Sequence, residues 1–477
     1  MKKTICTMLA LLMSVLLVFS LAACQETSDT ETPSVPTGSV EVPPEPWMPE
    51  NALELWNKVD ATMDALTSVE GTTVTKVVYY AMGYEFKMDS TMFSFSGDDA
   101  EYIEANVKNV CAEMELDQTI KTVNAYYDGK MYSAMNDGIY DQKLCSVATK
   151  EEYGAAMDGA LTDKVDISDC NGGKFSKNPD GTWTIEFSGY TNKTMNQLLE
   201  AMDMSDDMLG APIEDMKVTV LANKDFLCQS MSVNFVFEEQ EDSVKPEYSM
   251  TATYSKFNEA VFDGSVLKAE EYTEVADLFA LKKIEEDLAQ RQNATSGNFV
   301  LDLTTTTRYY GQTSKNKETD IVTYGKKNGA YYYSIIAETG DTEMTLVYQN
   351  GMQTVKADGE EYKNALTDAD AKATVDSLIN SALFNSLVVT NIEKEAEGVY
   401  MLTCDKVNLD VYSARVAATG VKLNSGEQAI KVTFDDDGNL VKIESLVFLK
   451  GKLEYDDVEF DLKSVVDFEK EADFPTI

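Results

Sequence analysis

Residues 217–220 read Lys-Val-Thr-Val, and residues 431–434 read Lys-Val-Thr-Phe. Each tetrapeptide alternates polar and apolar side chains with period two, which is typical of a β-strand with one buried face. A polar turn follows each of them, at residues 222–225 and 435–439, and a returning strand follows the turn. The same strand–turn–strand unit is therefore predicted twice.

The repetition extends through most of the chain. Gly71 and Gly297, 226 residues apart, each open an alternating strand that follows an apolar-faced helix. The first of these helices starts at a capping box formed by Asn51 and Glu54. Further pairs occur in the same order: Asp128-Gly129 with Asn350-Gly351, Asp137-Gly138 with Asp358-Gly359, Thr149–Glu152 with Thr367–Asp370, the strands at Trp183 and Tyr400, and the closing strands Tyr248–Tyr254 and Leu453–Leu462. This order indicates a tandem duplication. The copies differ most where the first has a predicted helix, Met195–Met202, because the matching stretch Val411–Leu423 is less clearly helical.

Length and composition agree with two folded units. A hydrophobic content of 44%, with 19 Phe and 24 Tyr, excludes a disordered chain. A core-forming region of about 430 residues exceeds the ~250–300 residues that one hydrophobic core usually serves. We therefore expect one domain over residues 51–268 and a second over residues 269–477.

The N-terminal segment has the features of an export signal. Lys2 and Lys3 precede an apolar run from Met8 to Leu21, which ends in Leu21-Ala22-Ala23-Cys24. This pattern resembles a bacterial lipoprotein signal peptide with its lipobox; an ordinary signal peptide or an uncleaved signal anchor is the alternative. The resemblance implies that residues 1–23 are removed and that Cys24 carries the lipid anchor. The chain would then lie on the extracytoplasmic face of the cell membrane.

Residues 24–50 form a predicted tether between this anchor and the folded part. Six of the ten prolines fall in this segment, among Thr, Ser and Glu. Such a composition cannot bury a core and favours an extended, polyproline-like spacer.

The predicted plan is a helix, a long antiparallel meander, a helical interruption and further strands, behind a lipobox and a tether. It resembles the carrier superfamily of the LolA and LppX lipoproteins in both halves. The resemblance implies an α+β fold class: two tandem domains, each a curved antiparallel sheet, or half-barrel, with helices covering its concave face. In that superfamily the covered face encloses an apolar cavity that holds acyl chains.

Charge and residue usage exclude several functions. The chain has 40 basic and 82 acidic residues, a net charge of −42, which argues against nucleic acid and against electrostatic docking on anionic lipid. The absence of histidine excludes Ser-His-Asp and Cys-His catalysis, and no phosphate-binding glycine motif is present. The acids at 435–437 are contiguous and indicate a hairpin turn, since a calcium loop alternates its ligands. We therefore expect no enzyme, no catalytic residue, no cofactor and no metal site.

The cysteines leave two interpretations open. Beyond Cys24, the candidates for structural roles are an odd set without paired spacing: Cys111, Cys145, Cys170, Cys228 and Cys404. One or two disulfides would suit an exported protein, and scattered buried thiols would suit the spacing equally.

Methionine is concentrated in the first half of the chain. These side chains are flexible and suit an adaptable apolar surface, although they also fill irregular cores. The residues concerned are Met82, Met88, Met92, Met114, Met131, Met135, Met157, Met195, Met202, Met204, Met208, Met216, Met231 and Met250.

Two functions follow as hypotheses. The first is a non-enzymatic lipoprotein that binds or carries a lipid or other amphipathic ligand in an apolar cavity, with the first copy favoured as the binder. The alternative is a cell-surface interaction or sensing module with packed cores and no small-molecule ligand. The sequence assigns no individual ligand-binding residue.

Overall fold

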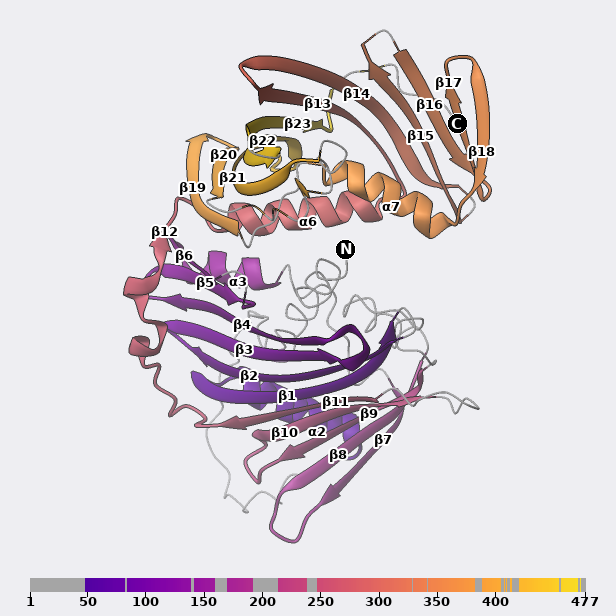
Figure 1. Cartoon of the computed structure of the whole chain (residues 1–477). Helices are drawn as coiled ribbons and strands as arrows, with labels where there is room; N and C mark the ends of the chain where they lie inside the picture. Colours follow the sequence, from indigo (N-terminus) through magenta and orange to yellow (C-terminus); the bar gives the residue numbers. More distant parts are fainter. Residues whose placement is uncertain are drawn as a thin grey trace. The chain divides into compact units, whose positions relative to one another are not determined.

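The structure is a computed structural model. It describes residues 48–472 except 82–83, 139–140, 159–169, 192–212, 238–246, 328, 341, 382–387, 405–406, 408, 410–411, 414–419, 454–455 and 471. The chain divides into two compact units (Figure 1). The first comprises residues up to 143 and residues 148–272, and the second comprises residues 144–147 and 273–477. In the described part, no helix is both long enough and apolar enough to cross a bilayer.

The first unit is built on a large antiparallel sheet. Its helices are α2 (Ala52–Asp64) and α3 (Lys150–Asp158), with single 3-10 turns at Ala112–Met114, Gly264–Leu267 and Ala269–Glu271. Its strands are β1 (Ser68–Ala81), β2 (Tyr84–Gly97), β3 (Ala100–Cys111), β4 (Leu116–Tyr127), β5 (Lys130–Asn136), β6 (Asp141–Val147), β7 (Cys170–Lys177), β8 (Trp183–Tyr190), β9 (Ile213–Ala222), β10 (Cys228–Phe237) and β11 (Glu247–Ser255). The two-residue strand β12 (Thr273–Glu274) pairs in parallel with Leu144 and Cys145 of β6, and these four residues belong to the second unit.

The second unit is built on an 11-stranded antiparallel sheet. Its helices are α6 (Phe279–Asn293) and α7 (Asp368–Ile379). Its strands are β13 (Ser296–Tyr309), β14 (Gln312–Lys327), β15 (Ala330–Thr339), β16 (Thr342–Gln349), β17 (Met352–Ala357), β18 (Glu360–Ala365), β19 (Val389–Ala396), β20 (Val399–Cys404), β21 (Lys422–Phe434), β22 (Leu440–Leu453) and β23 (Asp456–Asp467).

Both sheets have the same strand order. In the first it runs β6-β5-β4-β3-β2-β1-β11-β10-β9-β8-β7, and in the second β18-β17-β16-β15-β14-β13-β23-β22-β21-β20-β19. A helix precedes the first strand of each sheet, and another stands between the sixth and seventh strands. The first strand of each sheet is therefore central, because it pairs with both the second strand and the last.

The pairing registers join the sequence repeats into one row per sheet. Thr75 lies four residues after Gly71, and Leu301 lies four residues after Gly297. Successive cross-strand partners lead from Thr75 to Val218 and from Leu301 to Val432. Val218 and Val432 are the second residues of the two Lys-Val-Thr tetrapeptides. The first row is Val107, Ser90, Thr75, Met250, Val233 and Val218; the second is Ala337, Asp320, Leu301, Val466, Ile443 and Val432.

The predicted turns have the backbone that their sequences favour. Asp128 and Gly129 have φ of 52° and 72°, and Asn350 and Gly351 have φ of 53° and 77°. Positive φ at both central residues is the type I′ hairpin geometry that Asp-Gly and Asn-Gly adopt readily. The turn therefore joins β4 to β5 in one sheet and β16 to β17 in the other.

The predicted helix starts at Thr149 and Thr367 are also present. The Thr149 amide donates to the Glu152 carboxylate at 2.7 Å, and the Glu152 amide donates to the Thr149 hydroxyl at 3.1 Å. Thr367 and Asp370 exchange the same two bonds at the start of α7. Each box satisfies backbone groups that a helix terminus otherwise leaves unpaired.

The expectation of an α+β fold with helices covering the concave face is wrong. The described part of the chain is mostly β, and its few helices leave most of each sheet face without helical cover (Figure 1). The 13-residue α2 is roughly 20 Å long, whereas eleven strands at ~4.8 Å spacing span about 50 Å. A single short helix is therefore too small to shield such a sheet. The predicted Met195–Met202 helix, and residues 411 and 414–419 of its counterpart in the second half, lie outside the described residues.

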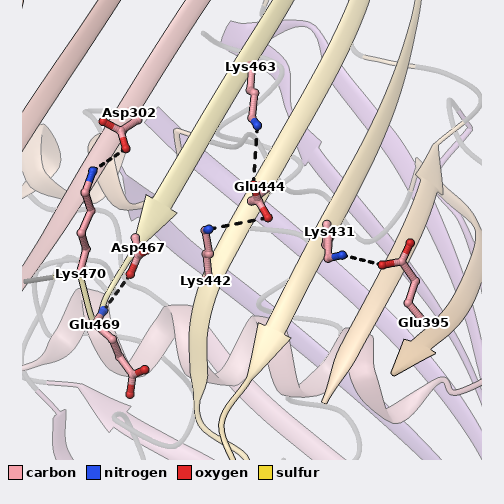
Figure 2. A network of polar contacts seen from close by, with 9 residues as sticks. All are labelled: Asp302, Glu395, Lys431, Lys442, Glu444, Lys463, Asp467, Glu469 and Lys470. Carbon is pink, nitrogen blue, oxygen red and sulfur yellow. Dashed lines mark hydrogen bonds and ion pairs between the residues drawn. The ribbon is translucent and has the colours of Figure 1, made fainter. Parts of the chain in front are cut away.

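We use "inner face" for the side of each sheet that bears the row defined above, and "outer face" for the other. The outer face of the second sheet carries Lys and acidic side chains from several strands (Figure 2). Lys431 reaches Glu395 at 2.6 Å, and Lys470 reaches Asp302 at 2.7 Å. Glu444 contacts Lys442 at 3.8 Å and Lys463 at 3.7 Å. These groups are substantially exposed, so each pair adds little stability.

The assignment of the two faces predicts that substitutions at neighbouring residues on β21 lower the stability by different amounts. Replacing Ile430, which is fully buried on the inner face, with alanine is expected to lower the free energy of unfolding by about 2–5 kcal/mol. Replacing Lys431 with alanine is expected to cost about 1 kcal/mol or less. Urea denaturation monitored by circular dichroism measures both. Equal effects of the two substitutions would contradict the assigned faces.

Candidate ligand-binding face of the first sheet

The inner face of the first sheet is a continuous apolar surface. Its buried side chains come from β1 to β3 and β8 to β10, β4 and β11 add half-buried ones, and α2 adds Ala52, Leu55 and Val59 at one end. The helix lies there because its apolar residues recur at helical spacing and because the Asn51 side chain accepts from the Glu54 amide at 2.9 Å. Gly173 on β7 allows this approach, since a Cβ there would lie 2.9 Å from the Ala52 Cβ.

Methionine is a main constituent of this face. Met88, Met92 and Met216 are buried in it, and Met114, Met231 and Met250 pack against it half-buried. By register, Met131 and Met135 on β5 lie on the same side. Of the remaining methionines named from the sequence, Met82, Met195, Met202, Met204 and Met208 lie outside the described residues, as does the side chain of Met157. The unbranched thioether side chains can change rotamer without large loss of packing.

Several buried polar side chains lie on this face, among them Thr73, Ser94 and Asn109, and two hydroxyl groups near its middle stand out. Thr75 on β1 and Ser90 on β2 are cross-strand partners and are 3% and 2% exposed. Neither hydroxyl oxygen has a hydrogen-bond partner among the described residues. A buried hydroxyl without a partner costs about 1–3 kcal/mol, and this cost is recovered if a ligand supplies the missing bond. Neither residue stands out in the sequence, because threonine and serine are common in strands.

The cysteines of this unit take part in packing. Cys111 and Cys228 are buried within the apolar face, and all five described cysteines are thiols. Burial raises the pKa of Cys228 to about 12, so its unreactive neutral form predominates. The Cys228 amide also lies 3.3 Å from the sulfur of Met63. The buried-thiol interpretation therefore holds for four of the five described cysteines, and the fifth, Cys170, is a half-buried thiol.

A separate hollow of about 340 Å³ lies at the rim of the first sheet. It is polar and is lined by Asp98, Asp99, Tyr126, Tyr127, Asp128, Gly129 and Lys150. The Lys150 ammonium already donates to the carbonyl oxygens of Gly97 and Asp98 at 2.7 and 3.3 Å, and it pairs with Glu101 at 3.2 Å. Lys150 therefore fastens the start of α3 to the β2–β3 turn.

Cys24, the predicted lipidation residue, lies outside the described residues. Asp435 forms a hairpin turn, in which its amide donates to the Asn439 carbonyl at 2.9 Å and its carboxylate accepts from the Asn439 amide at 2.7 Å. Within the described ranges, no three acidic, cysteine or histidine side chains are placed to hold a metal ion.

Comparison with known proteins gives no family. No protein-family profile matches the chain, and no curated protein matches it. Among solved structures, a Bacteroides fragilis protein assigned to the outer membrane aligns over 83% of this chain and 96% of its own, at 10% identity and a TM-score of 0.17. The translocator domain of the autotransporter NalP from Neisseria meningitidis aligns over 87% and 95%, at 5% identity and a TM-score of 0.10. TM-scores this low do not indicate a shared fold, so nothing is transferred from either protein.

The unpartnered Ser90 hydroxyl leads to a stability prediction. In the absence of ligand, Ser90→Ala is expected to leave the free energy of unfolding unchanged or to raise it by up to about 1 kcal/mol, because no protein hydrogen bond is lost. Ser445 is the matched control, since it is an equally buried serine on the inner face of the second sheet. Its hydroxyl accepts from the Gln428 amide at 2.9 Å, and Ser445→Ala is expected to cost about 1 kcal/mol. A clear loss of stability for Ser90→Ala in urea denaturation would contradict the assignment.

Proposed function

We propose that this protein is a membrane-anchored extracytoplasmic lipoprotein that binds an amphipathic ligand, without catalysis, on the inner face of the first sheet. The supporting observation is the pair of unpartnered hydroxyls, Thr75 and Ser90, set within a methionine-rich apolar face. An alkyl chain fits the apolar surface, and a polar head that can form hydrogen bonds fits the hydroxyls. The flexible methionines provide a way to open space for the chain.

The proposed anchor rests on Cys24 and the residues before it. Two or three acyl chains on one cysteine, at roughly 0.8 kcal/mol per buried methylene, hold a folded domain at a bilayer without any spanning helix. The proline-rich segment up to residue 50 separates this anchor from α2, which begins at Ala52. Without residues 1–23, which contain two lysines and no acid, the chain has 38 basic and 82 acidic residues, a net charge of −44. This charge keeps the folded units away from anionic lipid, so attachment depends on the acyl chains.

The anchor is tested by replacing Cys24 with serine. The chain with its wild-type sequence is expected in the membrane fraction of a bacterial host. Its intact mass is expected to exceed that of residues 24–477 by one diacylglyceryl group or more. Cys24→Ser is expected to move the protein out of the membrane fraction and to abolish the added mass. Cys6→Ser is the control, and it is expected to change neither. Membrane retention of the Cys24→Ser chain would contradict lipid anchoring at this residue.

Ligand binding is tested with the same Cys24→Ser chain, because it needs no detergent. Native mass spectrometry after incubation with vesicles of the zwitterionic lipid phosphatidylcholine is expected to show one lipid bound. The double variant Thr75→Val, Ser90→Ala loses two hydrogen bonds to the ligand head, and we expect about tenfold weaker binding with unchanged folding stability. Ser445→Ala is expected to bind like the parent chain. A chain that never carries lipid would contradict the proposal.

A surface interaction module is the second candidate. The observation that favours it is the edge strand β18, in which every residue is exposed and Tyr362 is 54% exposed. A row of unpaired backbone groups on an edge strand can add a strand from a partner chain. Absence of bound lipid together with capture of an extended peptide by β18 would favour this function over ligand binding.

A further inference from the structure

The inner face of the second sheet contains a buried carboxyl group, Asp320 on β14. The residue is 4% exposed, and its cross-strand partners are Leu301 on β13 and Ala337 on β15. Its Oδ1 atom has no hydrogen-bond partner among the described residues. Burial, together with a smaller effect of the Glu318 charge, raises the pKa of Asp320 to about 7. Since charged groups are rarely buried without a partner, this carboxyl requires an explanation.

The duplicated fold shows that this position does not need a carboxyl group. Asp320 and Ser90 occupy the same place in the two rows, on the second strand of each sheet and beside the strand that follows Gly297 or Gly71. Both side chains carry an unpartnered polar atom, a hydroxyl in the first sheet and a carboxyl oxygen in the second. The two copies therefore place different polar chemistry at one point of the same apolar face.

Access to Asp320 is available from the hairpin end of β13 and β14. On the inner face, exposure rises along β14 from the fully buried Val322, through Asp320, to the half-buried Glu318 and the exposed Asn316. The same change occurs on β15, from Ala337 at 7% exposure to the exposed Thr339. Asp320 is therefore the last buried polar group before the face opens to solvent.

An apolar surface adjoins the carboxyl group on the side of β16 and β17. By register, Met344 follows Ala337 in the Asp320 row, and Leu346 and Val355 occupy the next row. These three side chains are half-buried, as is Leu303 one row away on β13. They provide partly exposed apolar area next to a desolvated acid, which is the surface that an amphipathic molecule with a positive head requires.

We propose that the inner face of the second sheet binds a cationic amphiphile, with Asp320 accepting hydrogen bonds from its ammonium head and Leu303, Met344, Leu346 and Val355 contacting its alkyl chain. Glu318, an acidic group two residues away on the same face of β14, adds negative potential at the entrance. A hydrogen bond between two charged groups in a site of low dielectric is about twice as strong as a neutral one. The first sheet, with hydroxyls at the same place, lacks this preference, so the copies differ in ligand class.

The test is titration calorimetry on the Cys24→Ser chain with three single-chain probes: dodecylammonium and dodecanoate below their micelle concentrations, and dodecanol below its solubility limit. We expect dodecylammonium to bind at least about tenfold more tightly than either of the others, and Asp320→Asn to remove this difference. Asp302→Asn is the matched control, because Asp302 lies on the outer face of the neighbouring strand and pairs with Lys470. It is expected to leave dodecylammonium affinity within about twofold.

A stability measurement separates a binding role from a structural one. Without ligand, Asp320→Leu is expected to raise the melting temperature, because it removes an unpartnered buried carboxyl group. The same variant is expected to lose dodecylammonium binding. A lower melting temperature for both Asp320→Leu and Asp320→Asn, equal binding of the three probes, or full dodecylammonium affinity in Asp320→Asn would each overturn the proposal. The Thr75→Val, Ser90→Ala variant is expected to bind dodecylammonium like the parent, which keeps this test separate from that of the first sheet.

Discussion

The structure depends on removing one face of each wide antiparallel sheet from water. A sheet of eleven strands presents a large apolar surface on its inner side, and each square ångström removed from water contributes roughly 25 cal/mol. Because side chains alternate along a strand, a slip of one residue would turn Ile430 outward and Lys431 inward along the whole of β21. Local signals help to set the correct register, because they fix where strands and helices begin. They are the hairpin turns at Asp128-Gly129 and Asn350-Gly351 and the helix starts at Thr149 and Thr367.

Local features of the fold could be predicted because they depend on short stretches of sequence. An Asp-Gly or Asn-Gly pair between alternating segments favours a type I′ turn, and a threonine three residues before an acid favours a helix start; both occur in each unit. The two Lys-Val-Thr tetrapeptides and the two strand-opening glycines were recognised separately in the sequence. In the structure they are connected by the same row of paired residues in both sheets, so the repeat extends through the hydrogen-bonded register.

The cover of the inner faces and the polar groups on them could not be predicted in the same way. Alternation shows that a strand has a buried side but not what packs on it, which is why the expected helical cover was wrong. Asp320 could not be distinguished in the sequence from the other acidic residues, of which the chain has 82 in all. The adjacent apolar pair Ile321-Val322 also obscures which side of β14 is buried. Thr75 and Ser90 are residue types that are common in strands. Comparing the two copies strand by strand in the structure brings all three positions together.

The central position of β1 and β13 has a consequence for how the protein folds. β1 pairs with β2, its neighbour in sequence, and also with β11, where Glu70 lies opposite Ser255. β13 is likewise joined to β23, with Val300 opposite Asp467. Contacts between such distant residues require closure of long loops, which slows folding. As the chain emerges N-terminus first, each half can form its leading hairpins early, but the middle of its sheet keeps an unpaired edge until its last strand arrives.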